Sequence, residues 1–370
     1  MTRRTRFAAL AAVAALALSA CTGDDGDSAE DTATTEAGDA TEVETGQGQG
    51  GESVLARVQE AGEVRCGTRD DLPGFAVLDP AGDHVGFDAD FCRVIAAAVL
   101  GDAEAVNFVD VATADRFTAL QSGEIDVLVR NTTWTATRDG TEAATFLSTT
   151  FYDGQGMMVA ANSGITSLEQ LAGQVICVAG GTTTEGNVAT EFARLGLAAP
   201  EVLSFDDVDL VQEAFLGGRC DGWTSDRSQL TGLRTNYPGG ADSLVILDAT
   251  FSKEPLGPAV SDGDSQWAQV VDWAVLATIQ AEEFGLTKAN VAQQRDSSTN
   301  PSVRQFLGVE VDGATLDPGL GLPPDFAFQV VSQVGNYGEI YDAHITPLGL
   351  ERGQNELWTN GGLLYAPPYR

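Results

Sequence analysis

The feature that most constrains this sequence is an alternation of apolar strands and amphipathic helices that occurs twice. In the first run, strands are expected over residues 63–68, 105–111 and 125–129, and helices over 86–101 and 115–124. In the second run, strands are expected over 174–181, 201–205 and 219–226, and helices over 182–196 and 206–218. Strands separated by helices of this length build parallel sheets covered by helices. The sequence therefore predicts an α/β fold with two similar lobes.

Two extended, glycine-containing stretches flank the second run, "TTFYDGQGMMV" (149–159) and "TFSKEPLGPAVS" (250–261). They are interpreted as two chain crossings between the lobes. The predicted division is lobe 1 over 53–152, lobe 2 over 153–254, and the rest of lobe 1 with an aromatic C-terminal tail over 255–370. Each lobe then has a usual domain size.

The first residues, "MTRRTRFAALAAVAALALSAC", combine three arginines, a short apolar run and small residues, which indicates an export signal over 1–21. A transmembrane anchor is less favoured, because a span needs about 20 apolar residues. The ending Leu18-Ser19-Ala20-Cys21 resembles the bacterial lipobox, so Cys21 is the expected lipidation site.

Residues 22–52 contain ten acids, no base and no aromatic residue, which predicts a disordered acidic tether. The whole chain has a formal net charge of -34. Such a field repels nucleic acid and anionic membrane, so neither is an expected binding surface.

Four cysteines follow the lipobox, Cys66, Cys92, Cys177 and Cys220. An even number in an exported chain suggests two disulfides, with three possible connectivities, and free buried thiols are the alternative. The chain has two histidines and no closely spaced cysteine pair, so we expect no metal site and no cofactor.

Three polar stretches lie at the carboxyl ends of predicted strands, at residues 131–138, 180–187 and 221–226. Ligands of open α/β sheets gather at the carboxyl ends of strands and at helix N-termini. A guanidinium such as Arg138 binds a carboxylate with two parallel hydrogen bonds, and Asp226 can receive an ammonium group. Opposite charges from two lobes match the two ends of a free amino acid.

From residue 53 to 370 the chain resembles the general L-amino-acid-binding proteins of bacterial ABC importers, a branch of the two-lobed periplasmic solute-binding proteins. The resemblance is carried by long runs that include "RFTALQSGEIDVLVRNTTWTATRD", "ICVAGGTTTEGN", "SKEPLGPAV" and "QVGNYGEIYDAHITPLGLERGQNELWTNGGLLYAPPYR". It implies a type II periplasmic-binding-protein fold, in which two Rossmann-like lobes are joined by two crossing hinge segments.

The resemblance also implies a role for several residues. Arg138 matches the arginine that holds the ligand α-carboxylate, and Asp226 the acid that receives the α-ammonium group. The ligand backbone is expected to meet Asn131, Thr133 and the second-lobe amides at Thr182 and Thr183.

Many relatives place aromatic rings around the ligand side chain, but the matching positions here are near Leu72 and Thr113. This departure suggests broad specificity. Arg69, Asp70 and Asp71 either bias the choice toward charged or amide side chains or form a solvated loop.

Arg130 has no clear counterpart. It either approaches the ligand side chain or forms a salt bridge with an acid such as Asp115 or Glu124, and the salt bridge is the favoured interpretation.

Each predicted lobe contains one pair of cysteines. Bridges within lobes leave a hinge free to move, so we expect Cys66 to pair with Cys92 and Cys177 with Cys220.

The sequence thus predicts an extracytoplasmic, lipid-anchored, monomeric receptor that captures free L-amino acids by closure of two lobes and delivers them to an ABC permease. One alternative is an amino-acid-sensing receptor. Another is a dehydratase-like enzyme with Glu185 or Glu254 as its base, although no enzymatic activity is expected.

Overall fold

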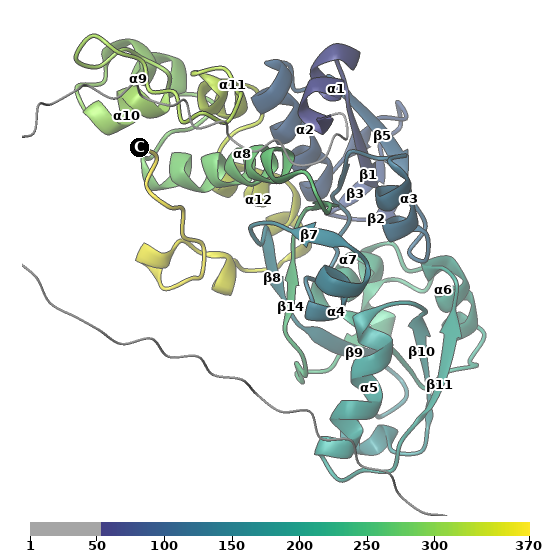
Figure 1. The fold of residues 1–370 in the computed structure, drawn as a ribbon. Coiled ribbons are helices and arrows are strands. Elements are labelled where there is room, and N and C mark those ends of the chain that lie inside the picture. Colours follow the sequence, from purple (N-terminus) through teal and green to yellow (C-terminus); the bar gives the residue numbers. More distant parts are fainter. Residues whose placement is uncertain (1–52) are drawn as a thin grey trace, which may run out of the picture. The chain divides into compact units, whose positions relative to one another are not determined.

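The structure is a computed structural model that describes residues 53–370 (Figure 1). The predicted signal, the lipidation site Cys21 and the acidic tether lie outside the described residues. Within residues 53–370, no helix is long and apolar enough to cross a membrane.

Two five-stranded sheets form the centres of the two lobes, and both have the same topology. The lobe 1 sheet has the order β5 (Val106–Asp110), β1 (Val64–Thr68), β6 (Val127–Leu128), β15 (Ala259–Ser261) and β7 (Ala144–Phe146). The lobe 2 sheet has the order β11 (Glu201–Phe205), β10 (Val175–Ala179), β12 (Gly222–Asp226), β9 (Gln155–Ala160) and β13 (Leu244–Ile246). The prediction of two similar α/β lobes is confirmed.

The first three strands of each sheet are parallel, as the strand–helix alternation predicts. The fourth strand of each sheet, β15 or β9, is antiparallel to its neighbours. It enters directly from a crossing segment instead of following a helix that would return the chain to the same end of the sheet. The sheets are therefore mixed and not wholly parallel.

The helices of lobe 1 are α1 (Val54–Ala61), α2 (Phe87–Leu100), α3 (Arg116–Ser122), α4 (Ala136–Thr141), α8 (Ser265–Glu283), α9 (Val291–Ser297), α10 (Pro301–Phe306), α11 (Phe326–Gln333) and α12 (Tyr337–His344). Those of lobe 2 are α5 (Thr183–Arg194), α6 (Val208–Leu216) and α7 (Arg227–Thr235). The remaining strands of lobe 1 are β2 (Asp71–Leu72), β3 (Ala76–Leu78) and β4 (His84–Val85). Short 3-10 helices cover Leu168–Leu171, Ala241–Ser243, Thr346–Leu348, Gly353–Asn355 and Trp358–Asn360.

Two crossing strands, β8 (Phe151–Asp153) and β14 (Glu254–Leu256), pair antiparallel and connect the lobes. Glu254 lies opposite Asp153, and Leu256 opposite Phe151. The predicted lobe boundaries fall within these two strands. The expected pair of crossing segments is confirmed, and its polar end enters the region between the lobes.

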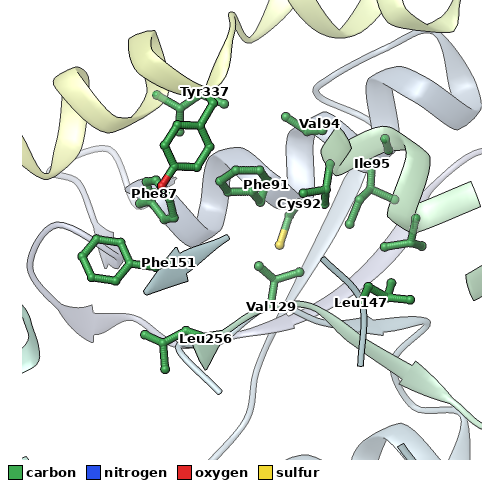
Figure 2. Close-up of a cluster of buried hydrophobic side chains, with 14 of the residues drawn as sticks. Phe87, Phe91, Cys92, Val94, Ile95, Val129, Leu147, Phe151, Leu256 and Tyr337 are labelled. Carbon is green, nitrogen blue, oxygen red and sulfur yellow. The ribbon is translucent and has the colours of Figure 1, made fainter. Parts of the chain in front are cut away.

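The core of lobe 1 joins helix α2 to a crossing strand and to the C-terminal tail (Figure 2). Eleven of the fourteen residues of α2 are buried. The Phe87 ring packs edge-on against Phe151 of β8 at 5.8 Å and against Tyr337 of α12 at 5.9 Å. The Tyr337 hydroxyl donates to the Thr150 carbonyl at 2.8 Å. The C-terminal tail thus contributes helices that cover lobe 1, and two of them, α11 and α12, lie where the sequence "PDFAFQVVSQVGNYGEIYDAHI" favours a helix.

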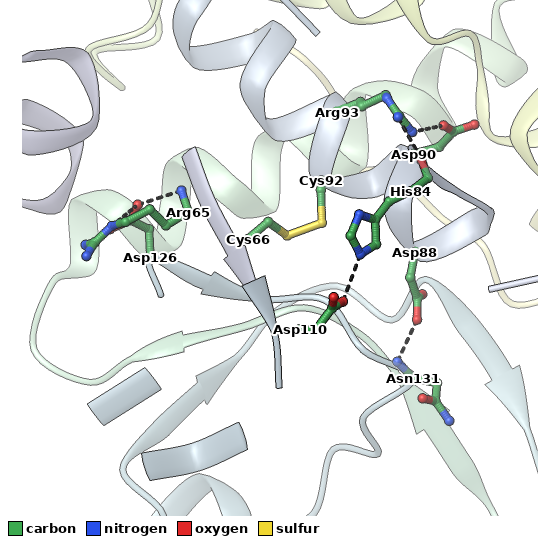
Figure 3. The surroundings of a disulfide bond; sticks show 10 residues. All are labelled: Arg65, Cys66, His84, Asp88, Asp90, Cys92, Arg93, Asp110, Asp126 and Asn131. Atoms are coloured by element: carbon green, nitrogen blue, oxygen red, sulfur yellow. Dashed lines mark hydrogen bonds and ion pairs between the residues drawn. A yellow bond between two sulfur atoms is a disulfide. The ribbon is translucent and has the colours of Figure 1, made fainter. Parts of the chain in front are cut away.

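Both disulfides lie within a lobe, with the predicted pairing. Cys66 of β1 is bonded to Cys92 of α2 (Figure 3), and Cys177 of β10 to Cys220, which precedes β12. The paired Cα atoms are 6.0 and 5.7 Å apart. Neither bridge restrains the crossing strands.

Candidate ligand-binding site

A cavity lies where loops at the ends of strands in both lobes meet. Lobe 1 contributes Arg69, Thr113, Arg116, Arg130, Asn131, Thr133 and Arg138, and lobe 2 contributes Ala179, Thr182, Thr183, Thr184, Val208, Ser225, Asp226 and Gln229. Seven of the eight residues that the sequence assigns to a ligand line this cavity. The exception is Leu72.

Leu72 is fully buried in the hydrophobic core and lines neither this cavity nor the one described below. Its position follows from the hairpin of β2 and β3, which turns the side chain inward. Thr113 does line the cavity and accepts a hydrogen bond from Arg130 Nη2 at 3.0 Å. The structure therefore separates two residues that the sequence placed together around a ligand side chain.

Asn131 begins the polar loop after β6 and adopts the left-handed conformation, with φ 30°. Asparagine tolerates this conformation better than most residues. Its backbone N–H donates to Asp88 Oδ2 at 2.7 Å (Figure 3). Its side-chain amide donates across the lobes to Gln229 Oε1 at 3.2 Å. Burial raises the pKa of Asp88 to about 7, although the Asn131 amide partly offsets that rise.

Arg138 lies in the first turn of α4, a short helix that the sequence did not predict. Thr135 caps the helix by accepting from the Arg138 N–H at 3.2 Å. The guanidinium donates from Nη1 to the Thr133 carbonyl at 2.8 Å and lies over the Phe117 ring. Burial lowers the pKa of Arg138, while Glu254 and Asp226 act in the opposite direction. A cation is thus held at the cavity wall by a neutral carbonyl and an aromatic face.

Arg116 is a second buried arginine at the cavity, which the sequence analysis missed. It is the first residue of α3, and its Nη2 donates across the lobes to the Gly181 carbonyl at 3.2 Å. Its Nε has no hydrogen-bond partner in the described part of the chain. Burial lowers the pKa of Arg116 well below its usual value, and Arg138 adds to the effect. The signal that could have identified Arg116 as a cavity residue is its position at the start of a helix that follows a strand, β5.

Arg130 corrects a prediction. Its Nε donates to the Val111 carbonyl at 2.8 Å and its Nη2 to Thr113, so its partners are not the acids Asp115 or Glu124. Both acids are exposed, whereas Arg130 is buried and lines the cavity. Burial, and then the charge of Arg69, lower the pKa of Arg130 to about 9.

The N-terminus of α5 forms the lobe 2 wall of the cavity. Thr182 caps this helix by accepting from the Glu185 N–H at 3.2 Å, and it donates to the Ala179 carbonyl at 2.6 Å. Thr183 and Thr184, the first two residues of the helix, line the cavity. The N-terminal end of a helix favours an anion there.

Asp226 ends β12 and precedes α7, and it is 5% exposed. Its Oδ1 has no hydrogen-bond partner among residues 53–370. Burial raises the pKa of Asp226 well above its usual value, and the charges of Asp153 and Glu254 raise it further. Burial also raises the pKa of Asp153 to about 6. Asp226 therefore lacks a hydrogen-bond partner that would fully stabilise its charged form.

Glu254 of crossing strand β14 connects the two lobes and is 1% exposed. Its Oε2 accepts from the Thr133 hydroxyl of lobe 1 at 2.6 Å and from the Thr183 hydroxyl of lobe 2 at 2.8 Å. Its Oε1 accepts from Asn187 Nδ2 at 2.9 Å and from Ser252. The hydroxyls of two predicted ligand contacts are therefore engaged by a hinge carboxylate, and the Thr133 carbonyl is engaged by Arg138. The backbone N–H of Thr183, at the start of α5, remains for a ligand.

The other candidate base, Glu185, accepts from the Gly181 N–H at 3.1 Å. The histidines contact carboxylates away from the cavity: His84 Nε2 lies 2.8 Å from Asp110 Oδ1, and His344 Nε2 lies 2.7 Å from Asp90 Oδ2. The titratable groups that face the cavity are arginines and Asp226. This arrangement suits the binding of a charged molecule.

Known proteins resemble this chain over most of its length. Residues 64–289 match the profile of the bacterial extracellular solute-binding proteins, family 3. The chain is 45% identical to the glutamate/glutamine/aspartate/asparagine-binding protein BztA of Rhodobacter capsulatus, over 86% of this chain and 94% of that protein. It is 46% identical to the general L-amino acid-binding periplasmic protein AapJ of Rhizobium johnstonii, over 86% of this chain and 93% of that protein.

Among solved structures, the chain is similar to an ABC transporter periplasmic binding protein from Brucella ovis with glutathione bound. The TM-score is 0.83 and the identity 42%, over 86% of this chain and all of the other. These relatives carry solutes and are not described as enzymes. The type II periplasmic-binding-protein fold implied by the sequence is thereby confirmed.

Proposed function

The chain belongs to family 3 of the bacterial extracellular solute-binding proteins, and from this premise we propose that it captures free L-amino acids of broad side-chain range for an ABC importer. The proposal includes an extracytoplasmic location, lipid anchoring through Cys21, a monomeric state and delivery to a membrane permease. The names of BztA and AapJ support amino acids as the cargo.

One observation carries the proposal. A buried guanidinium and a buried carboxyl group, each with an unpaired polar atom, face the same cavity from opposite lobes: Arg116 Nε on one side and Asp226 Oδ1 on the other. A buried polar atom without a partner costs about 1–3 kcal/mol, and more when charged. An α-amino acid supplies both missing partners, because its carboxylate complements Arg138 and Arg116 and its ammonium group complements Asp226.

Closure of the lobes follows from the way these groups are divided. In the proposed sequence of events, the carboxylate binds Arg138 of lobe 1 first. Lobe 2 then brings Asp226 and the first-turn amides of α5 into contact with the ligand. Since those contacts exist only in the closed arrangement, the ligand shifts the population toward it. For micromolar affinity, the contacts in the closed arrangement must supply a net binding free energy of about -8 kcal/mol.

The proposal is tested by thermal unfolding of the purified protein with each of the twenty amino acids and with reduced glutathione, followed by calorimetry of every ligand that stabilises it. We expect several amino acids to raise the unfolding temperature. Arg138→Ala and Asp226→Ala should lose this response, whereas the exposed Arg219→Ala and Asp242→Ala should retain it. Stabilisation by no amino acid would reject the proposed cargo.

The competing functions differ in simple observations. An enzyme would convert its amino acid, so recovery of the ligand unchanged after long incubation supports a binding protein. A sensing receptor would bind the same ligands without transport. Uptake of labelled amino acid by cells that lack the gene, with and without complementation, separates that role from import.

A further inference from the structure

A second cavity adjoins the first. The two cavities share four lining residues, Arg69, Thr113, Arg130 and Val208. No residue assigned above to the α-carboxylate or the α-ammonium group lines the second cavity. It therefore continues the first cavity on the side away from those residues, and we name it the side chamber.

Arg69 lies at the junction of the two cavities and is 3% exposed. Its Nε pairs with Asp71 at 2.5 Å, and its Nη1 donates to Asn131 Oδ1 at 3.1 Å. Its Nη2 has no hydrogen-bond partner within the described region. A buried guanidinium nitrogen in this condition favours a ligand that brings an acceptor, best of all a carboxylate.

Carboxylates line the side chamber beyond this junction. Asp70, Asp71, Asp110 and Asp207 line the side chamber but not the first cavity. Three of them are engaged: Asp71 by Arg69, Asp110 by His84 (Figure 3), and Asp207 as the cap of α6. No hydrogen bond or ion pair of the Asp70 side chain is found in residues 53–370, and this residue is exposed. The outer part of the chamber therefore favours a cation.

We propose that the side chamber is a side-chain subsite of two signs: Arg69 at its entrance receives the carboxylate of acidic amino acids, and the Asp70 region beyond it receives the cationic end of basic amino acids. Acidic side chains are short and end at the junction. The longer stems of lysine and arginine pass the junction and place their charge among the carboxylates. This inference rests on the proposed function, since it places the α-groups in the first cavity.

The test is calorimetric affinity for L-glutamate, L-glutamine and L-lysine in the complete purified protein. Glutamine is the neutral reference, because it matches glutamate in size. Wild-type protein should bind all three ligands. Arg69→Gln should lower the glutamate-to-glutamine affinity ratio at least tenfold without lowering the lysine-to-glutamine ratio. Asp70→Asn should lower the lysine-to-glutamine ratio about threefold without lowering the glutamate-to-glutamine ratio.

These opposite shifts separate a specificity role from a structural one, since general damage would weaken all three ligands together. Unchanged ratios in both variants would overturn the subsite, and so would wild-type protein that binds only one sign of side chain. If Arg69→Gln does not fold, Arg69→Lys should retain most of the glutamate preference. Absence of binding for all three ligands, with no stabilisation by any of the twenty amino acids, would reject the proposed function itself. Absence of binding for these three alone, or glutamine binding with unshifted ratios, rejects only the subsite.

Discussion

The two lobes share one sheet topology but present different chemistry to the cavity between them. In lobe 1, the loops after β5 and β6 place arginines at the cavity, among them Arg116 and Arg138. In lobe 2, Val208 follows the corresponding strand β11, and Asp226 ends the corresponding strand β12. The N-terminus of α5 completes the lobe 2 wall of the cavity. The third strand of each sheet, β6 or β12, thus leads to a basic group in lobe 1, Arg138, and to an acidic group in lobe 2, Asp226.

This comparison shows that the fold determines the place of the binding groups and not their charge. The carboxyl ends of equivalent strands lie at the same edge of each sheet, so both lobes offer loops there. A zwitterion can then be held only when both lobes contribute. Each prediction below tests how far that division of roles extends.

The largest effect is expected from removing one charge from either lobe. Arg138→Ala and Asp226→Ala should each weaken binding of a preferred amino acid at least a thousandfold, about 4 kcal/mol, because the opposite ligand charge would remain buried without its partner. The double variant should lose little more than either single variant, since both act on one bound molecule. Calorimetry measures both effects, and a single variant that binds within tenfold of wild type would show that one lobe suffices.

The disulfides allow a second comparison between the lobes. Removing Cys66–Cys92 by paired serine substitutions should destabilise lobe 1 by about 3.5 kcal/mol, and removing Cys177–Cys220 should destabilise lobe 2 by about 4 kcal/mol, because the second loop is longer. The sequence separations are 26 and 43 residues. Denaturant unfolding of each variant measures the loss. A larger loss for the shorter loop would contradict the loop-entropy explanation.

Glu254 lies in a crossing strand and accepts hydrogen bonds from side chains of both lobes. Its substitution therefore tests how much these hydrogen bonds between the lobes contribute to closure and ligand binding. Glu254→Ala should weaken ligand affinity about thirtyfold, or about 2 kcal/mol, because several donors lose their acceptor. Glu254→Gln, which retains one acceptor, should cause a smaller loss, and the exposed Glu201→Ala should cause none. Small-angle scattering should show reduced ligand-induced compaction in Glu254→Ala. Unchanged compaction and affinity would confine Glu254 to a local role.

The smallest effect concerns pH and tests the acidic lobe 2 side alone. Burial raises the pKa of Asp226 well above its usual value and that of Asp153 to about 6, so the ligand-free pair binds protons that the ligand ammonium group displaces. Binding then releases a proton. Affinity should therefore be higher at higher pH. It should fall by at most tenfold per pH unit as the pH is lowered through the range in which these two carboxyl groups take up a proton.

Calorimetry from pH 5 to pH 8, in buffers of different ionisation enthalpy, measures both the affinity and the released protons. Asp153→Asn should flatten the pH dependence, because it removes a neighbouring charge that raises the pKa of Asp226. Constant affinity across this range would mean that Asp226 is already ionised before the ligand binds.

Much of the architecture was predictable because apolar periodicity is a local property of the chain. The strand predicted over 201–205 coincides with β11, and the helix predicted over 86–101 differs from α2 by one residue at each end. The short helices α4 and α7 were not predicted, because segments of six and nine residues with few apolar positions give little periodic signal. Arg138 was nevertheless identified, since it follows a predicted strand in a polar loop.

The sequence by itself determined two α/β lobes, two crossing segments, the cysteine pairs and most of the residues around the cavity. These depend on local patterns and on runs of sequence shared with known relatives. Only the tertiary structure placed Leu72 in the core, brought Arg116 beside Arg138, and showed that Glu254 joins Thr133 to Thr183. Each of these facts depends on the proximity of groups from different helices, strands and loops, which apolar periodicity along the chain does not encode.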